Sequence, residues 1–166
     1  MSKLRYSINQ PFSNWWATRI GQVVLNFSAV ELETYRWLVQ LSENPERIPE
    51  WSNKPFKVRV QDIISYMDNR SYTPEWKSKS TAAWHEAECL ARKRNRIAHN
   101  PLLFGWVDGK EDGEPDFIGV VDIRYPDKAE PFLKKDEISA IVNRIAELAP
   151  MLGSLREEWC AVRDSQ

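Results

Sequence analysis

Hydrophobic residues along this chain recur mostly at three- and four-residue spacing, the period of a helix that buries one face. This spacing predicts one long helix over residues 13–41. Three prolines within residues 45–55 then predict a loop. A shorter helix is expected around residues 60–67, although residues 57–60 alternate in polarity and are also compatible with an extended segment.

The third predicted helix has the clearest limits. Thr73 is a suitable N-cap, and Pro74 occupies the first helical position, where proline is tolerated. The helix should end near Ala98, because Pro101 disfavours helical geometry in the residue before it.

The pattern changes after this helix. Residues 102–107 and 117–125 are rich in Val, Ile and aromatic residues and predict a β-hairpin inserted between helices, about 102–125. A last helix begins near Asp136, and Pro150 is expected to kink or interrupt it. The predicted fold class is mainly α, an antiparallel four-helix-type bundle with a small inserted β-hairpin.

Composition narrows the class of protein. A chain of 166 residues fits a single domain over residues 1–166. The net charge of −1 predicts no overall basic field, so that an RNA site would be a local patch. Two distant cysteines, Cys89 and Cys160, favour a reducing, cytoplasmic setting, and no apolar run approaches the roughly 20 residues of a membrane span. The eight tryptophans are expected to serve mostly as core or subunit-interface anchors.

Candidate chemistry concentrates at the end of the third helix. His99 follows shortly after a run in which four of five residues are basic. The four are Arg92, Lys93, Arg94 and Arg96. One interpretation is a solvated charged helix end, since cations at a helix C-terminus are favoured by the helix dipole. The other is a site for an anionic substrate.

A helical wheel favours the second interpretation. The apolar face of this helix runs through Ala87, Leu90 and Ile97, and Arg94 falls inside it. A buried arginine requires an anionic partner or a functional cleft. On the first helix Glu31 lies within the apolar stripe, which predicts a Glu31–Arg94 ion pair between the two helices.

The polar face of the same helix is ordered. Glu88, Arg92, Asn95 and His99 recur on it at three- and four-residue spacing, so that the Asn95 amide can orient the imidazole of His99. A histidine can transfer a proton near neutral pH, and an arginine can stabilise charge developing on a phosphate. With only two histidines, a His-rich metal centre is not expected.

The run from Arg94 to His99 resembles the Arg-x4-His motif of HEPN domains, in which a polar residue often follows the arginine. The resemblance covers most of the chain except the inserted hairpin. It implies a metal-independent endoribonuclease without a cofactor, in which Arg94 steadies the phosphate, His99 acts in proton transfer with the RNA 2′-OH and Asn95 fixes the geometry. Arg92, Lys93 and Arg96 would bind RNA, with Glu31 and Glu88 in support.

The resemblance also implies a homodimer with two motifs facing one cleft, and a toxin or defence role with a possible antitoxin partner. Arg94 and His99 lie about 140° apart around a regular helix, so that the site requires a loosened helix end or the facing subunit. Two alternatives stay open. One is a non-catalytic HEPN-like module that binds nucleotide or RNA or serves as the partner subunit of a toxin–antitoxin or defence pair. The other is a helical dimerisation module whose basic helix end is only solvated.

Overall fold

The computed structural model describes residues 5–7, 14–70, 72–99, 102–106, 115–120 and 133–163. The described residues group into two compact units. The sheet-bearing unit comes from residues 1–25 and 92–143, and the helical unit from residues 26–91 and 144–166. The assignment of the whole chain to one domain therefore stays a prediction.

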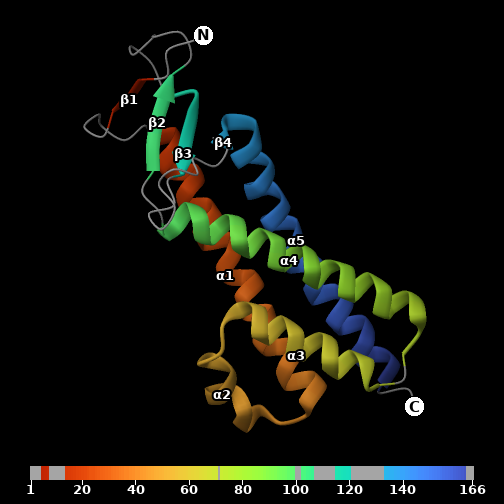
Figure 1. Cartoon of the computed structure of the whole chain (residues 1–166). Helices are drawn as coiled ribbons and strands as arrows, with labels where there is room; N and C mark the ends of the chain where they lie inside the picture. Colours follow the sequence, from red (N-terminus) through yellow and green to blue (C-terminus); the bar gives the residue numbers. More distant parts are fainter. Residues whose placement is uncertain are drawn as a thin grey trace. The chain divides into compact units, whose positions relative to one another are not determined.

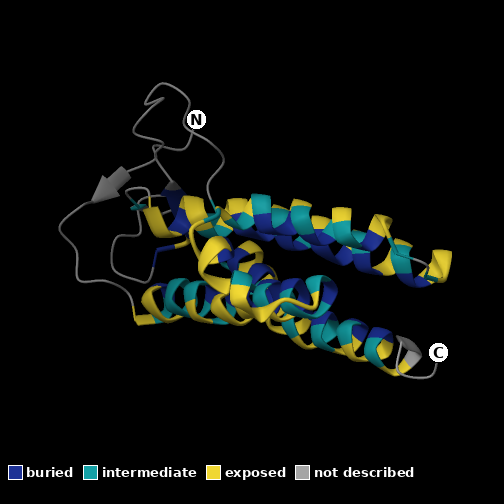
Figure 2. Cartoon of the chain, turned by 90° about the horizontal axis from the view of Figure 1, so that it is seen from below, coloured by how far each residue is buried: buried dark blue, intermediate teal, exposed yellow. Residues whose placement is uncertain are grey.

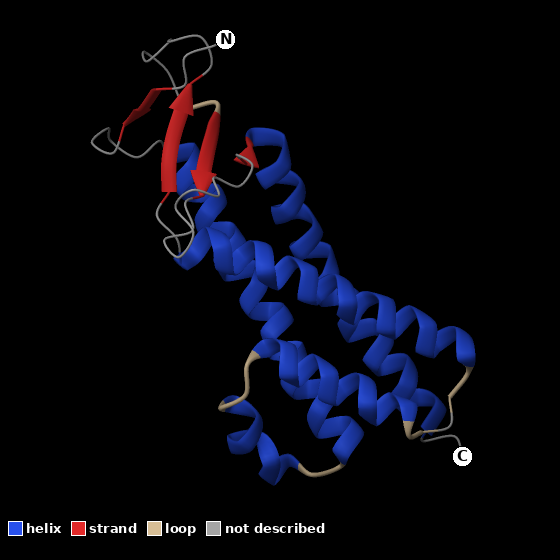
Figure 3. Cartoon of the chain, in the orientation of Figure 1, coloured by secondary structure: helices blue, strands red, loops and turns tan. Residues whose placement is uncertain are grey.

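Helices dominate the described part of the chain, which confirms the mainly α fold class (Figures 1 and 3). The packing of four helices into one antiparallel bundle stays a prediction, because the three long helices contribute to both units. No helix within the described residues is apolar over a length that would cross a bilayer. The helices are α1 (Asn14–Ser42), α2 (Ile48–Ser52), α3 (Phe56–Asp68), α4 (Pro74–His99) and α5 (Lys135–Arg163).

The predicted limits of α4 are confirmed at both ends. The Thr73 hydroxyl accepts a hydrogen bond from the backbone N–H of Trp76 at 3.3 Å, the contact that an N-cap makes. The predicted apolar face is also confirmed, since Ala87, Leu90 and Ile97 are all buried. Figure 2 shows buried residues alternating with exposed ones around the helices.

Two predictions made from prolines were wrong in whole or in part. Residues 45–55 do not form a plain loop but a 3₁₀ turn (Pro45–Arg47) followed by α2, each with a proline in its first turn. Helices accept proline there because the N–H it lacks has no acceptor in the first turn. Pro150 was expected to kink or interrupt the last helix. It does not interrupt α5, which is continuous from Lys135 to Arg163, and the kink stays a prediction. Residues 57–60, left open between helix and strand, are helical.

The predicted hairpin is confirmed over residues 102–106 and 117–120, and it belongs to a larger antiparallel sheet with the order β1-β2-β3-β4. Residues 107 and 121–125, also predicted as strand, lie outside the described residues. Its two longer strands are β2 (Leu102–Trp106) and β3 (Phe117–Val120), which pair with Phe104 opposite Ile118. The short strands β1 (Arg5–Ser7) and β4 (Leu133–Lys134) pair with the two outer edges and were not predicted. Strands of three and two residues are too short to show an alternating pattern.

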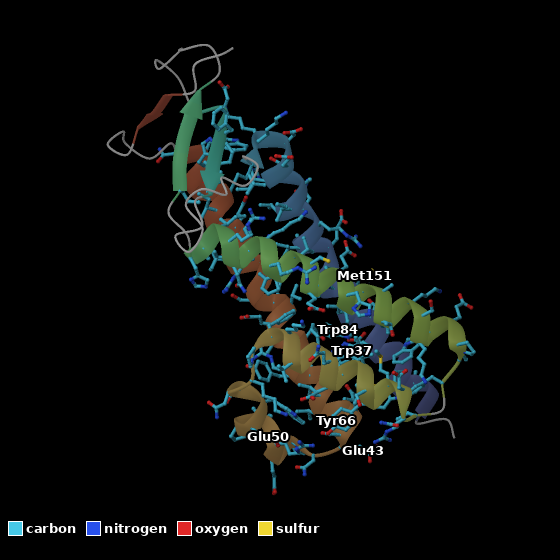
Figure 4. The ribbon with its side chains drawn as sticks, in the orientation of Figure 1. Trp37, Glu43, Glu50, Tyr66, Trp84 and Met151 are labelled. Atoms are coloured by element: carbon cyan, nitrogen blue, oxygen red, sulfur yellow. The ribbon has the colours of Figure 1, made fainter. Side chains whose placement is uncertain are left out.

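Tryptophans form much of the core of the helical unit. Trp37 lies edge-on to Trp84 with ring centroids 5.7 Å apart and stacks with Trp76 at 5.6 Å (Figure 4). The indole N–H groups of Trp37 and Trp76 donate to the carbonyl oxygens of Leu152 and Leu155, both at 3.0 Å. The rings therefore bury apolar area and tie α1 and α4 to α5 within this unit.

Two carboxylates of the helical unit are held by arginine forks. Glu86 of α4 accepts from Arg144 of α5 at 2.5 and 2.6 Å, and this pair lowers the pKa of Glu86. Glu50 of α2 accepts from Arg47 at 2.9 and 3.0 Å, and hydrogen bonds from Arg47 and then Lys54 lower the pKa of Glu50 to about 2 (Figure 4).

These shifts predict a loss of stability in acid. Both carboxyls have pKa values below that of an unfolded glutamate, about 4.3, so that the pairs stabilise the fold above that pH. The stabilisation is lost as the pH falls from about 4.3 towards 2. We expect Glu86→Gln and Glu50→Gln each to flatten the fall in melting temperature over this range, measured by circular dichroism. Glu46→Gln, at an exposed glutamate, is the control and should follow the parent.

Candidate functional site

The candidate site lies on the last two turns of α4, in the part of the helix that belongs to the sheet-bearing unit. The helix dipole stabilises the basic side chains of this segment, because the C-terminal end of a helix carries partial negative charge. Five polar side chains of this segment are exposed, four of them from Arg, Lys or His: Arg92, Lys93, Asn95, Arg96 and His99. A polyanionic ligand can therefore reach them.

Arg94 differs from its basic neighbours because it begins on the apolar face of the helix. It is only half-buried, and its position next to buried Ile97 and Ala91 agrees with the helical wheel. Its Nη1 donates a hydrogen bond to Oδ1 of Asn95 at 2.8 Å. The guanidinium is therefore held at Asn95, a residue of the exposed polar face.

The hydrogen bond to Asn95 matters for the position of the Arg94 guanidinium relative to the helix face that bears His99. Arg94 and His99 leave a regular helix about 140° apart. Asn95 and His99, by contrast, are four residues apart and share one face. The guanidinium of Arg94 therefore turns towards the face that bears Asn95, and the helix is continuous to His99.

Glu88 and Glu31 belong to the helical unit, and their supporting roles stay predictions. Glu88 lies on α4 six residues before Arg94 and is half-buried. Glu31 has a side chain that is 34% exposed, and its carboxylate lies 4.0 Å from Nη2 of Arg59. The Glu31–Arg94 pair joins residues of different units and stays a prediction as well.

Sequence reasoning missed a buried carboxylate on α1. Glu33 is 4% exposed, and its two oxygens accept hydrogen bonds from Arg36 at 2.7 Å and Arg156 at 3.2 Å. Arg156 also donates to Gln40 at 3.1 Å. The Arg36 partner is visible in the sequence as an i, i+3 pair, whereas Arg156 lies on α5 and leaves no local signal. Both carboxylate oxygens are occupied by guanidinium groups, which makes this cluster a structural ion pair.

A second buried charge was also missed. Arg59 of α3 is 6% exposed, and its Nη1 donates to the Tyr35 hydroxyl at 2.8 Å and to the Lys54 carbonyl at 3.1 Å. Its guanidinium also lies over the Tyr35 ring at 4.7 Å. The alternating polarity of residues 57–60 hid the helical face on which Arg59 lies.

Within the described residues, no group of three or more His, Cys, Asp or Glu side chains is arranged to hold a metal ion. Comparisons of the chain with models of known protein families, with curated proteins and with solved structures find no match. The residues and contacts at the end of α4 are therefore the features that bear on function.

Proposed function

We propose that this protein is a metal-independent endoribonuclease of the HEPN type that cleaves single-stranded RNA at the end of α4. One observation carries the proposal. Arg94 donates to Asn95 at 2.8 Å, which brings a guanidinium to the exposed helix face that also bears His99. A phosphate-binding cation and a proton-transfer group can thus address one phosphodiester.

The proposed reaction is an internal transesterification. The RNA 2′-oxygen loses its proton to a base, attacks the adjacent phosphorus and displaces the 5′-oxygen, which takes up a proton. The products are a 2′,3′-cyclic phosphate and a 5′-OH. His99 carries one of the two proton transfers, and Arg94 stabilises the charge that gathers on the phosphoryl oxygens. Asn95 accepts from Arg94 and so keeps the guanidinium in place.

The second proton transfer calls for another group, which a second copy of the same motif can supply. We therefore propose a two-fold homodimer with its interface near His99, the commonest closed symmetry for a small protein. Static light scattering at micromolar concentration tests this directly. The expected mass is that of a dimer, and the mass of a monomer would contradict the shared site.

The exposed cations of the α4 end are proposed to hold the RNA backbone. Arg92, Lys93 and Arg96 form a local basic patch on a chain whose net charge is −1. Such contacts make binding salt-dependent, because bound phosphates release counterions. An enzyme that cuts RNA in the cytoplasm needs restraint, which fits a toxin or defence role with an antitoxin partner. Cys89 and Cys160 are not joined in a disulfide, which is compatible with that compartment.

The proposal predicts cleavage of labelled single-stranded RNA by pure protein in excess EDTA. Products should end in a 2′,3′-cyclic phosphate, seen by mass spectrometry. DNA of the same sequence, and RNA methylated at each 2′-oxygen, should not be cut because both lack the nucleophile. Cleavage that EDTA abolishes, or that DNA also undergoes, would contradict the mechanism. RNA binding without cleavage would instead support a non-catalytic RNA-binding module.

A further inference from the structure

Trp15 stands apart from the other tryptophans of this protein. Six of the seven tryptophans whose side chains the structure describes are buried, and Trp15 is only half-buried. It lies in the first turn of α1, in the sheet-bearing unit that also carries the candidate site. A large aromatic ring kept at the surface is common where bases or other flat ligands bind.

The Trp15 ring packs against the buried ring of its neighbour Trp16. It packs edge-on against Trp16, with ring centroids 4.9 Å apart and an interplanar angle of 84°. Trp16 is fully buried, and its indole N–H donates to the Pro115 carbonyl at 2.8 Å. The contact with buried Trp16 therefore restricts the Trp15 ring, and Trp15 itself stays half-buried.

Two cations lie over the same ring. The guanidinium carbon of Arg19 lies 5.5 Å from the ring centroid, and Nζ of Lys135, the first residue of α5, lies 5.6 Å from it. Arg19 also donates to Gln22 on the same helix at 3.0 Å. Both distances are within the range of cation–π attraction. An accessible aromatic ring combined with cations is the arrangement that binds single-stranded nucleic acid.

We propose that Trp15 is a stacking platform for one base of the single-stranded RNA, with Arg19 and Lys135 binding the phosphates on either side of that base. The substrate class rests on the proposed ribonuclease function, whereas the platform itself rests on the Trp15 geometry. A base that stacks on the ring replaces one of the cations. The long side chains of Arg19 and Lys135 can then turn to the neighbouring phosphates. Stacking accepts any base, so the platform adds affinity without sequence preference.

Binding is measured in a His99→Ala background, which prevents cleavage, by fluorescence anisotropy of short labelled RNA. We expect Trp15→Leu to weaken binding by about 5- to 150-fold, the loss of one base–aromatic stack. Trp15→Phe keeps an aromatic face and should recover most of that loss. Unlabelled single-stranded DNA should compete, because stacking needs no 2′-OH.

Abasic RNA separates stacking from a purely structural role of Trp15. In a series of probes, each with one base removed, one position should weaken binding to the Trp15-containing protein by the same factor as Trp15→Leu. That probe should bind Trp15→Leu no worse than intact RNA does. If the ring only stabilises the fold, Trp15→Leu would lower affinity for every probe and retain the full penalty of the abasic position, which would overturn the proposal.

The cations have their own readout. Arg19→Ala and Lys135→Ala should each reduce the slope of log affinity against log salt by about 0.7, the loss of one phosphate contact on a single strand. Lys79→Ala, at an exposed lysine of the helical unit, is the matched control and should leave the slope unchanged. Unchanged slopes for both variants would overturn the phosphate role of these two side chains.

The outcomes distinguish this proposal from the proposed function. If the parent protein cuts RNA and Trp15→Leu binds and cuts it equally well, the platform is refuted and the ribonuclease stands. If His99→Ala binds RNA through Trp15 but the parent cuts none, the ribonuclease fails and the platform stands. A parent that neither binds nor cuts RNA refutes both.

Discussion

Replacement of His99 by alanine is expected to reduce RNA cleavage by about 10²–10⁴-fold, the usual contribution of one general acid or base. The effect should be on the rate of the chemical step, measured by single-turnover cleavage at saturating protein. His99 is exposed on the last turn of α4, so the melting temperature should stay within about a degree of the parent, because exposed substitutions rarely change stability by more than about 0.5 kcal/mol.

The matched control is His85→Ala. His85 is the only other histidine of the chain, and it is exposed on the same helix. Its removal should leave cleavage unchanged. Imidazole added to the buffer should restore part of the activity of His99→Ala, since the free base can then transfer the proton, and should not stimulate the parent. Full activity of His99→Ala would show that the proposed mechanism is wrong.

The start and the buried face of α4 could be predicted from the sequence because the residues that determine them are local. Thr73 and Pro74 fix where the helix starts, and the periodicity of Ala87, Leu90 and Ile97 fixes which face is buried. The position of Arg94 on that face followed from the same periodicity. The direction of its guanidinium did not, because a long side chain can turn towards either neighbouring face, and only the structure places it on Asn95.

Features that depend on distant partners were beyond the reach of sequence patterns. The helical wheel of the first helix predicts that Glu31 lies in the apolar stripe. The structure instead buries Glu33, whose partner Arg156 lies on α5. A glutamate next to the apolar stripe of a helix is normally expected at the edge of that stripe, because burial of an unpaired carboxylate is unfavourable. The ion pair with Arg156 makes the burial of Glu33 favourable, and no local pattern reveals that pair. The surroundings of Trp15 could not be predicted from local sequence either, because its neighbour Lys135 lies 120 positions further along the chain.

The edges of the sheet were missed for a related reason. β1 and β4 are held by pairing with β2 and β3 and not by any strand pattern of their own. The hairpin residues themselves carried a clear signal, because both β2 and β3 are rich in apolar residues. Local propensity thus predicted the two strands that define the sheet, and long-range pairing added the other two.

The largest effect on stability is expected at Glu33. Its side chain is 6% exposed and lies between Arg36, which is 53% exposed, and Arg156, which is 17% exposed. Removal of one partner of a buried ion pair costs about 3–5 kcal/mol, because the other charge is left without its counter-ion. Arg36 can turn to water, whereas Arg156 remains largely covered and keeps only a longer contact, 3.8 Å, with the exposed carboxylate of Glu157. We therefore expect Glu33→Ala to lower the free energy of unfolding by about 3 kcal/mol, the lower end of that range.

Urea denaturation followed by circular dichroism measures this loss, with Glu43→Ala as the control. Glu43 pairs with Arg70 at 3.1 Å, but its side chain is 53% exposed, so that its removal should cost less than about 1 kcal/mol. Arg156→Ala in the Glu33→Ala background should cost little more, since the stranded charge is removed with it. Because Glu33 lies outside the α4 end, RNA cleavage per folded molecule should be unchanged. A loss at Glu33 no larger than that at Glu43 would show that Arg156 does not depend on this carboxylate.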